Sequence, residues 1–210
     1  MLNRLIDWLR QRDVASNASN LAATAPPVNV APSPVASPVE TPAAAPAAAP
    51  AAVPLDQTVR IDELSDAATI AGALFRRKFG QEIPNFPRHF VAMIGGNCAG
   101  YVHYTAWQGD YLCGGLCIDD RAYRTLSSEQ REWLRERGGI AEIMMRHAHA
   151  ALTDGATIWG YIGDKQAEAV DRRVGFEKVA EPYLFAIWRK PISEDGKRRR
   201  IVEAVKLGGF

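Results

Sequence analysis

A pair of glycines followed by a helical pattern is the part of this sequence best suited to holding an anion. Gly138 and Gly139 precede apolar residues at helical spacing, which run from Ile140 to Leu152 and form one broad face. The first amides of a helix lack intrahelical partners, and the helix dipole places partial positive charge there. The stretch can therefore bind a phosphate or another anion. The alternative is a helix whose start is merely flexible.

Three cysteines and one histidine offer a second kind of chemistry. Cys113 and Cys117 are four residues apart, so on a regular strand they face the same side, and they are predicted to be small core residues rather than redox thiols. With Cys98 the number is odd and no spacing is typical of a metal site, so neither a disulfide framework nor a metal site is predicted. His103 lies in a strand pattern, where a packed histidine is the expectation and a catalytic base is the alternative.

The composition of the chain limits the number of domains and the classes of function that these residues can belong to. The 210 residues carry 25 basic and 24 acidic side chains, so bulk electrostatic binding of nucleic acid is not expected. Hydrophobic residues make up 47% of the chain, which is enough for one well-packed domain but not for two. No apolar run is long enough for a membrane-spanning helix. The cysteine content fits a reducing, cytoplasmic setting.

The first quarter of the chain differs from the rest. Residues 1–13 have the pattern of a short amphipathic helix, which could dock on a protein partner or an anionic membrane surface and so tether the protein peripherally. The alternative is a frayed segment, because so short a helix is marginal alone. Residues 14–54 contain nine of the thirteen prolines among alanines and valines, so a disordered, semi-rigid linker is predicted.

The folded domain is predicted over residues 55–210. A first strand (58–61) and a helix (62–78) precede three strands in quick succession, which are joined by glycine-containing turns. Ser127 and Gln130 have capping-box spacing before a charged helix. The remaining elements alternate between strand and helix, so the fold class is α/β (α+β), with a central mixed sheet flanked by helices. The other predicted strands are 89–94, 98–107, 111–118, 156–162, 175–179 and 182–188, and the other helices are 129–137, 140–152 and 166–174.

This order, together with two local motifs, resembles the GNAT superfamily of coenzyme-A-dependent N-acyltransferases over about residues 57–190. The family's pyrophosphate loop reads Gln/Arg-x-x-Gly-x-Gly/Ala before its central helix, and Gly139 and Ala141 match it here. The second motif reads Ala-x-x-x-Tyr-x-x-x-Gly-Phe, of which Ala167, Gly175 and Phe176 match.

The resemblance implies that acetyl-coenzyme A or another acyl-coenzyme A is the co-substrate and that the acceptor is a small-molecule or peptide amine. In the family two central strands diverge, and the pantetheine pairs with their edges, which here would be residues 116–118 and 159–162. The pyrophosphate would lie at Gly138 and Gly139, where a bulky side chain would block its approach. The residues thereby assigned to the coenzyme are Leu116, Cys117, Ile118, Arg137, Gly138, Gly139, Ile140, Ala141, Glu142 and Asp164.

The chemical step is where the chain departs from the family. Glu136 replaces the first residue of the loop, Asp164 stands where asparagine is common, and Asp171 stands at the family's tyrosine, which protonates the leaving thiolate. An aspartate is ionised at neutral pH unless strongly perturbed, and it would then be a poor proton donor. Asp171 and its candidate substitutes Tyr161 and Tyr183 are therefore the catalytic candidates. The alternative function is a catalytically inactive GNAT-like binding or interaction module, tethered through its N-terminal helix.

Overall fold

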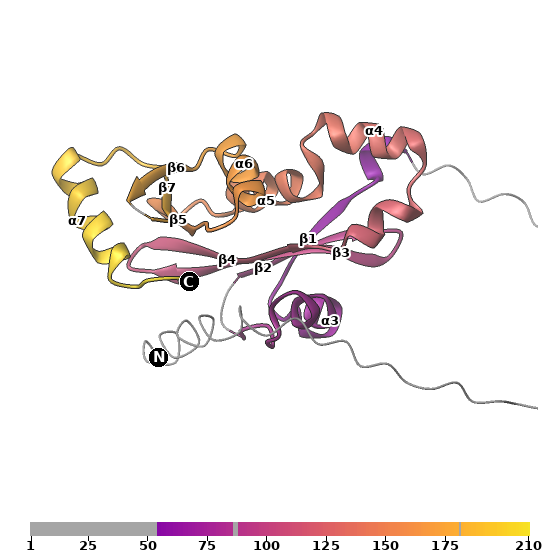
Figure 1. Ribbon diagram of the computed structural model, residues 1–210, viewed down its shortest axis with the longest axis horizontal. Helices are drawn as coiled ribbons and strands as arrows, with labels where there is room; N and C mark the ends of the chain where they lie inside the picture. Colours follow the sequence, from indigo (N-terminus) through magenta and orange to yellow (C-terminus); the bar gives the residue numbers. More distant parts are fainter. Residues whose placement is uncertain (1–53, 86–87, 181) are drawn as a thin grey trace, which may run out of the picture.

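The computed structural model describes residues 54–85, 88–180 and 182–210 (Figure 1). The helix expected over residues 1–13 and the linker expected over 14–54 lie outside these residues, apart from Pro54. The strands are β1 Arg60–Leu64, β2 Arg88–Ile94, β3 Asn97–Trp107, β4 Asp110–Ile118, β5 Thr157–Tyr161, β6 Glu177–Ala180 and β7 Leu184–Trp188. The helices are α3 Ala68–Phe79, α4 Ser128–Glu136, α5 Gly139–Ala151, α6 Lys165–Arg173 and α7 Glu194–Val205, with short 3₁₀ turns η1 Leu55–Gln57 and η2 Asp120–Thr125.

The strands form one mixed sheet in the order β1-β2-β3-β4-β5-β7-β6. All neighbours are antiparallel except β4 and β5, which are parallel. Helix α3 covers one face of the sheet, while α4, α5 and α6 lie on the other (Figure 1). The predicted α/β class with a helix-flanked mixed sheet is confirmed.

The helix predicted over residues 62–78 begins later than expected. Asp62 lies within β1, which pairs with β2 from Arg60 to Leu64. Helix α3 starts only at Ala68, whose amide donates to the Asp66 carboxylate at 2.9 Å. The strand continues because its pairing with β2 supplies backbone partners that an isolated polar segment would lack.

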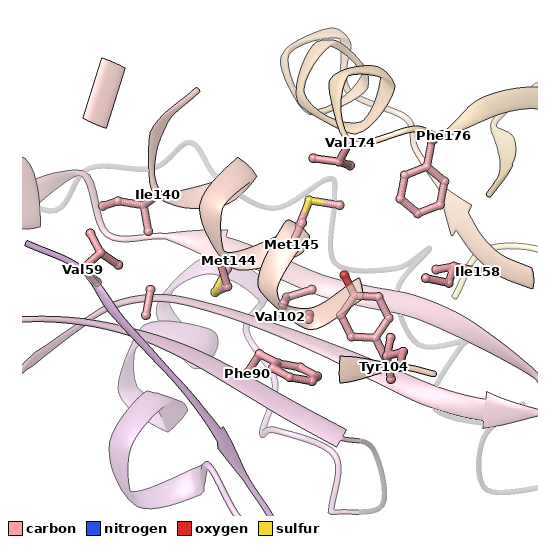
Figure 2. Close-up of a cluster of buried hydrophobic side chains, with 14 of the residues drawn as sticks. Val59, Phe90, Val102, Tyr104, Ile140, Met144, Met145, Ile158, Val174 and Phe176 are labelled. Carbon is pink, nitrogen blue, oxygen red and sulfur yellow. The ribbon is translucent and has the colours of Figure 1, made fainter. Parts of the chain in front are cut away.

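The main core lies between α5 and the sheet. Figure 2 shows Met144 of α5 on the side of the helix that faces Val102 of the sheet, and the Met145 side chain directed toward Val174 at the end of α6. The predicted apolar face is buried at Ile140, Met144, Ala148 and Leu152, whereas His147, predicted on the same face, is exposed and Met145, outside it, is buried. The capping box predicted before α4 is also present, because the Ser127 side chain accepts from the amide of Gln130 and the Gln130 side chain accepts from the amide of Ser127.

Helix α7 is held against the first residue of β4 by an ion pair. Arg200 donates to the Asp110 carboxylate at 2.5 Å, and the indole of Trp159 donates to the same oxygen at 3.0 Å. Asp110 is only 2% exposed, so its charge depends on these donors. The contact places the segment after α7 beside β5, where Phe210 is buried against Trp159.

The two cysteines of β4 face opposite sides of the sheet, contrary to the prediction. Cys113 packs on the α5 side, whereas Cys117 packs on the α3 side. Between them the register with β3 slips by one residue, and Gly115 adopts a left-handed φ of 64°. Such a β-bulge adds one residue to its strand and so reverses the alternation of side chains beyond it. Both cysteines are free, and Cys117 is buried.

Candidate functional site

Strands β4 and β5 diverge soon after they meet. Their parallel register consists of three pairs and ends at Cys113 and Gly160. Beyond this point lies a cavity of about 260 Å³ between the two strands, closed by α6 and by Phe210. Predicted site residues from three elements meet around it, namely Leu116, Tyr161, Asp164 and Asp171. The splayed strands expected from the resemblance are therefore present.

A second cavity of about 390 Å³ continues from the first toward the start of α5. The two cavities share four lining residues, Phe79, Leu116, Asp164 and Ala167. The second adds the predicted residues Cys117, Ile118 and Ala141. Together they form a slot that runs from between the strands to Ala141 in the first turn of α5.

A third and more open cavity of about 930 Å³ lies at the junction of α4 and α5. Five arginines and two glutamates line it, and four of the arginines pair with glutamates inside or beside the cavity. The predicted residues Arg137, Gly138, Gly139 and Glu142 are among its walls. Sequence reasoning found only Arg137 of the arginines, because tertiary packing brings the others together. They are Arg131, Arg135, Arg146 and Arg173.

The Glu142 side chain constrains the turn formed by Gly138 and Gly139, which we call the glycine turn. The Glu142 carboxylate binds Arg146 at 2.7 Å and Arg173 at 2.8 Å, and the hydrogen bond from Arg173 is the main cause that lowers its pKa. A Cβ on Gly138 would collide with this carboxylate. Gly138 and Gly139 also have φ values of 78° and 86°, which disfavour any other residue. The backbone thus requires both glycines, independently of the phosphate approach expected from the sequence.

One amide of the turn has a partner inside the protein. The backbone N–H of Ile140 donates to the hydroxyl of Tyr123 at 3.2 Å. An anion on the turn would therefore bind beside this amide or displace the tyrosine hydroxyl. The arginines of the third cavity offer such an anion further donors.

Asp171 occupies an apolar position that its sequence context did not reveal. It lies on α6, is 5% exposed and lines the cavity between the strands. Burial raises the pKa of its carboxyl to about 7. Burial is thus the strong perturbation that would keep an aspartate at this position from being ionised at neutral pH. A carboxyl group with this pKa is partly protonated near pH 7 and can donate a proton there.

Two further polar groups surround Asp171 and were not predicted as site residues. Burial raises the pKa of the Cys113 thiol and of the Tyr104 hydroxyl, and the nearby charge of Asp171 raises both further. Figure 2 shows the Tyr104 hydroxyl directed toward the helix side of the core. No sequence pattern marks this cluster, since both residues fit an ordinary strand pattern.

The two candidate tyrosines differ in position. Tyr161 lines the cavity, whereas Tyr183 is 42% exposed. Their rings contact each other edge to face, with centroids 5.6 Å apart. Tyr161 is therefore the better placed of the two phenols.

The raised pKa of Asp171 predicts how the free energy of unfolding depends on pH. The native carboxyl keeps its proton up to about pH 7, whereas an unfolded aspartate loses it near pH 4. Between these values the native state binds more protons, so the parent loses stability relative to Asp171→Asn as the pH rises. Their difference in unfolding free energy should grow by up to about 1.4 kcal/mol per pH unit and level off above pH 7.

Urea denaturation of both proteins between about pH 5 and about pH 8 measures this difference. The subtraction cancels the opposite contribution of His149, whose pKa burial lowers to about 4. A difference that does not change with pH would contradict the raised pKa of Asp171.

Within the described residues, no helix has the length and apolarity to cross a membrane. The same part of the chain holds no cluster of three or more histidine, cysteine or acidic side chains that could bind a metal ion.

Comparison with known proteins gives structural neighbours but no sequence match. No family model matches the chain, and no curated protein matches it significantly. Among solved structures, the chain is similar to the ribosomal-protein-S18-alanine N-acetyltransferase from Escherichia coli, with 13% identity, a TM-score of 0.45 and coverage of 65% of this chain and 97% of that one. An acetyltransferase of the GNAT family from Streptococcus pneumoniae shows 15% identity and a TM-score of 0.45, covering 62% of this chain and 98% of the other.

A GNAT family acetyltransferase from Brucella melitensis, solved in complex with acetyl-CoA, is 16% identical with a TM-score of 0.42. The similarity covers 66% of this chain and 92% of that protein. At these identities and TM-scores the likeness says nothing about the activity of this chain. GNAT is the family that the two sequence motifs resemble.

Proposed function

We propose that this protein transfers an acetyl or other acyl group from acyl-coenzyme A to a primary amine. The observation that carries the proposal is the slot between β4 and β5, which contains the buried carboxyl of Asp171 at its inner end. An unpaired strand edge can bind an extended amide-containing chain, as the pantetheine arm is. A proton donor at the same place suits a reaction that releases a thiolate.

The residues present fit such a co-substrate along its length. The acyl-pantetheine would lie in the slot past Leu116 and Ala167, which leave the passage between the two cavities open. The phosphates would lie near the start of α5, where the helix dipole and the arginines of the third cavity favour negative charge. Arg135 and Arg137 are the arginines of this group closest in sequence to the glycine turn.

The reaction needs two proton transfers. The amine must lose its proton before its lone pair attacks the thioester carbon, and the carbon–sulfur bond then breaks with its electron pair on sulfur. Asp171 donates a proton to that sulfur, which leaves as a thiol. Because an ordinary thiol has a pKa of about 8.5, transfer from a carboxyl with a pKa of about 7 is favourable. Asp171 thus replaces the family's tyrosine in role as well as in position.

Release of free thiol from acetyl-coenzyme A by the full-length chain tests the proposal. We expect release that depends on the amine, measured across a panel of small amines, polyamines and peptide amino termini. Titration with acetyl-coenzyme A and desulfo-coenzyme A in parallel reports binding separately from turnover. Binding without amine-dependent release across the whole panel would contradict transfer and support an interaction module instead.

A further inference from the structure

The cavity between β4 and β5 has different walls on the two faces of the sheet. On one face it is lined by Asp171 of α6, and on the other by Phe210, which follows α7 and is 3% exposed. The two faces are told apart by consecutive residues of β4, because Cys113 packs with the core under α5 whereas Leu112 packs with Phe210. Figure 1 shows the residues after α7 on the same face of the sheet as α3.

Phe210 is held in place by several elements. It is buried in one apolar cluster with Trp159 of β5 and Ala204 of α7. Its ring also contacts that of Tyr161, with centroids 6.1 Å apart. The preceding residue lies close to the same tyrosine, since a Cβ on Gly209 would come within 3.3 Å of the Tyr161 ring. The ring therefore cannot move aside without opening a cavity in this packing.

The path proposed for the coenzyme directs the acyl group toward Phe210. The pantetheine arm comes from the side of α5 through the second cavity of the slot, and ahead of it the gap between the strands ends where Cys113 pairs with Gly160. Asp171 can protonate the sulfur only from within hydrogen-bond reach, so the carboxyl occupies the α6 side of the sulfur. The acyl carbon bonded to that sulfur then extends to the opposite side, where Tyr161 and Phe210 line the cavity.

The space at this end of the slot is small. The cavity between the strands measures about 260 Å³. Pockets that hold a whole drug-sized ligand range from about 300 to 1,000 Å³. This cavity has to hold the sulfur end of the pantetheine arm as well as the acyl group. The remaining room suits a short acyl group.

We propose that Phe210 limits the length of the acyl group, so that the protein takes acetyl-coenzyme A and excludes coenzyme A with longer acyl chains. The proposal rests on the proposed acyl transfer and names the class of its acyl donor. An acetyl group ends before the phenyl ring, whereas the methylenes of a butyryl or hexanoyl chain meet it. One methylene in an apolar pocket changes affinity by roughly 10- to 200-fold, so the ring is a sufficient cause of selection.

Titration of the full-length chain with acetyl-, butyryl- and hexanoyl-coenzyme A, without any amine, tests this role by binding alone. In the parent we expect the affinity to fall at least about 10-fold from the acetyl to the butyryl compound. Phe210→Ala should raise the affinity for butyryl-coenzyme A at least about 10-fold and change that for acetyl-coenzyme A little. Phe210→Leu keeps an apolar side chain in the cluster and should favour the butyryl compound to a smaller extent.

Leu207→Ala is the matched control, because Leu207 packs against the same cluster as Phe210 and lines neither cavity of the slot. It should keep the selectivity of the parent. Equal affinity of the parent for acetyl- and butyryl-coenzyme A would overturn the role of Phe210. An unchanged preference for acetyl in both Phe210 variants would do the same, as would an equal gain in Leu207→Ala.

Two results separate this inference from the acyl transfer on which it rests. A parent that binds none of the three compounds would overturn the coenzyme site and, with it, the selection by Phe210. A parent that prefers acetyl-coenzyme A, loses this preference in Phe210→Ala and yet releases no thiol with any amine would overturn the transfer alone. It would support Phe210 as the residue that selects the acyl group.

Discussion

Asp171→Asn is expected to lower amine-dependent thiol release by roughly 100- to 10,000-fold near pH 6.5, the range for loss of a positioned general acid. The change keeps the size of the side chain and removes the proton that the carboxyl carries when its pKa is about 7. Asparagine is uncharged and nearly the same size, so we expect the buried position on α6 to accept it. The affinity for acetyl-coenzyme A should change little.

The pH dependence separates this role from a structural one. In the parent, release should fall above about pH 7 as Asp171 ionises, whereas the residual rate of Asp171→Asn should not fall with it. Glu168→Gln is a matched control, because it makes the same chemical change on α6 at a residue that pairs with Arg172. Thiol release by Asp171→Asn at the rate of the parent would show that Asp171 is not the general acid. Tyr161 would then be the next candidate.

Ala167→Phe is expected to abolish binding of acetyl-coenzyme A, weakening it at least about 100-fold, because a clash of this size costs several kcal/mol. Ala167 lies on α6 where the two cavities of the slot meet, and a phenyl ring would fill the passage between them. Isothermal titration measures the loss, and far-UV circular dichroism checks the fold.

Ala169→Phe provides the comparison for this variant. Ala169 is on the same helix but is exposed and lines neither cavity of the slot. Its change to phenylalanine should leave binding at the parent level. Equal affinity of the parent and Ala167→Phe would show that the coenzyme does not pass through the slot.

Much of the fold was predictable because its signals are local. Alternating strand patterns, the glycine turns and the Ser127–Gln130 capping box each act over a few residues, and the structure confirms them. The boundary error at residues 62–64 arose because pairing with β2, a distant segment, decides where β1 ends. The prediction that Cys113 and Cys117 face the same side of the sheet was wrong for a related reason, since a bulge in a strand pair depends on both strands.

The candidate site was predictable in outline and not in its chemistry. Residues from three predicted elements do line the slot, but the pKa of Asp171 follows from burial that only the packed fold produces. Likewise, the sequence could not show that Glu142 lies against Gly138, and thus that the glycine turn is held by an ion-paired carboxylate. These features arise from tertiary packing, which a local sequence pattern does not show.

The most direct test of the central claim is to follow an isotope-labelled acetyl group from acetyl-coenzyme A into an amide. Full-length protein is incubated with the labelled co-substrate and the amine panel, and the labelled product is counted by mass spectrometry against free thiol. Transfer predicts one labelled amide for each thiol released, formed by the parent and almost absent with Asp171→Asn. Acetyl-coenzyme A that binds in the slot yet yields no labelled amide from any amine would contradict it.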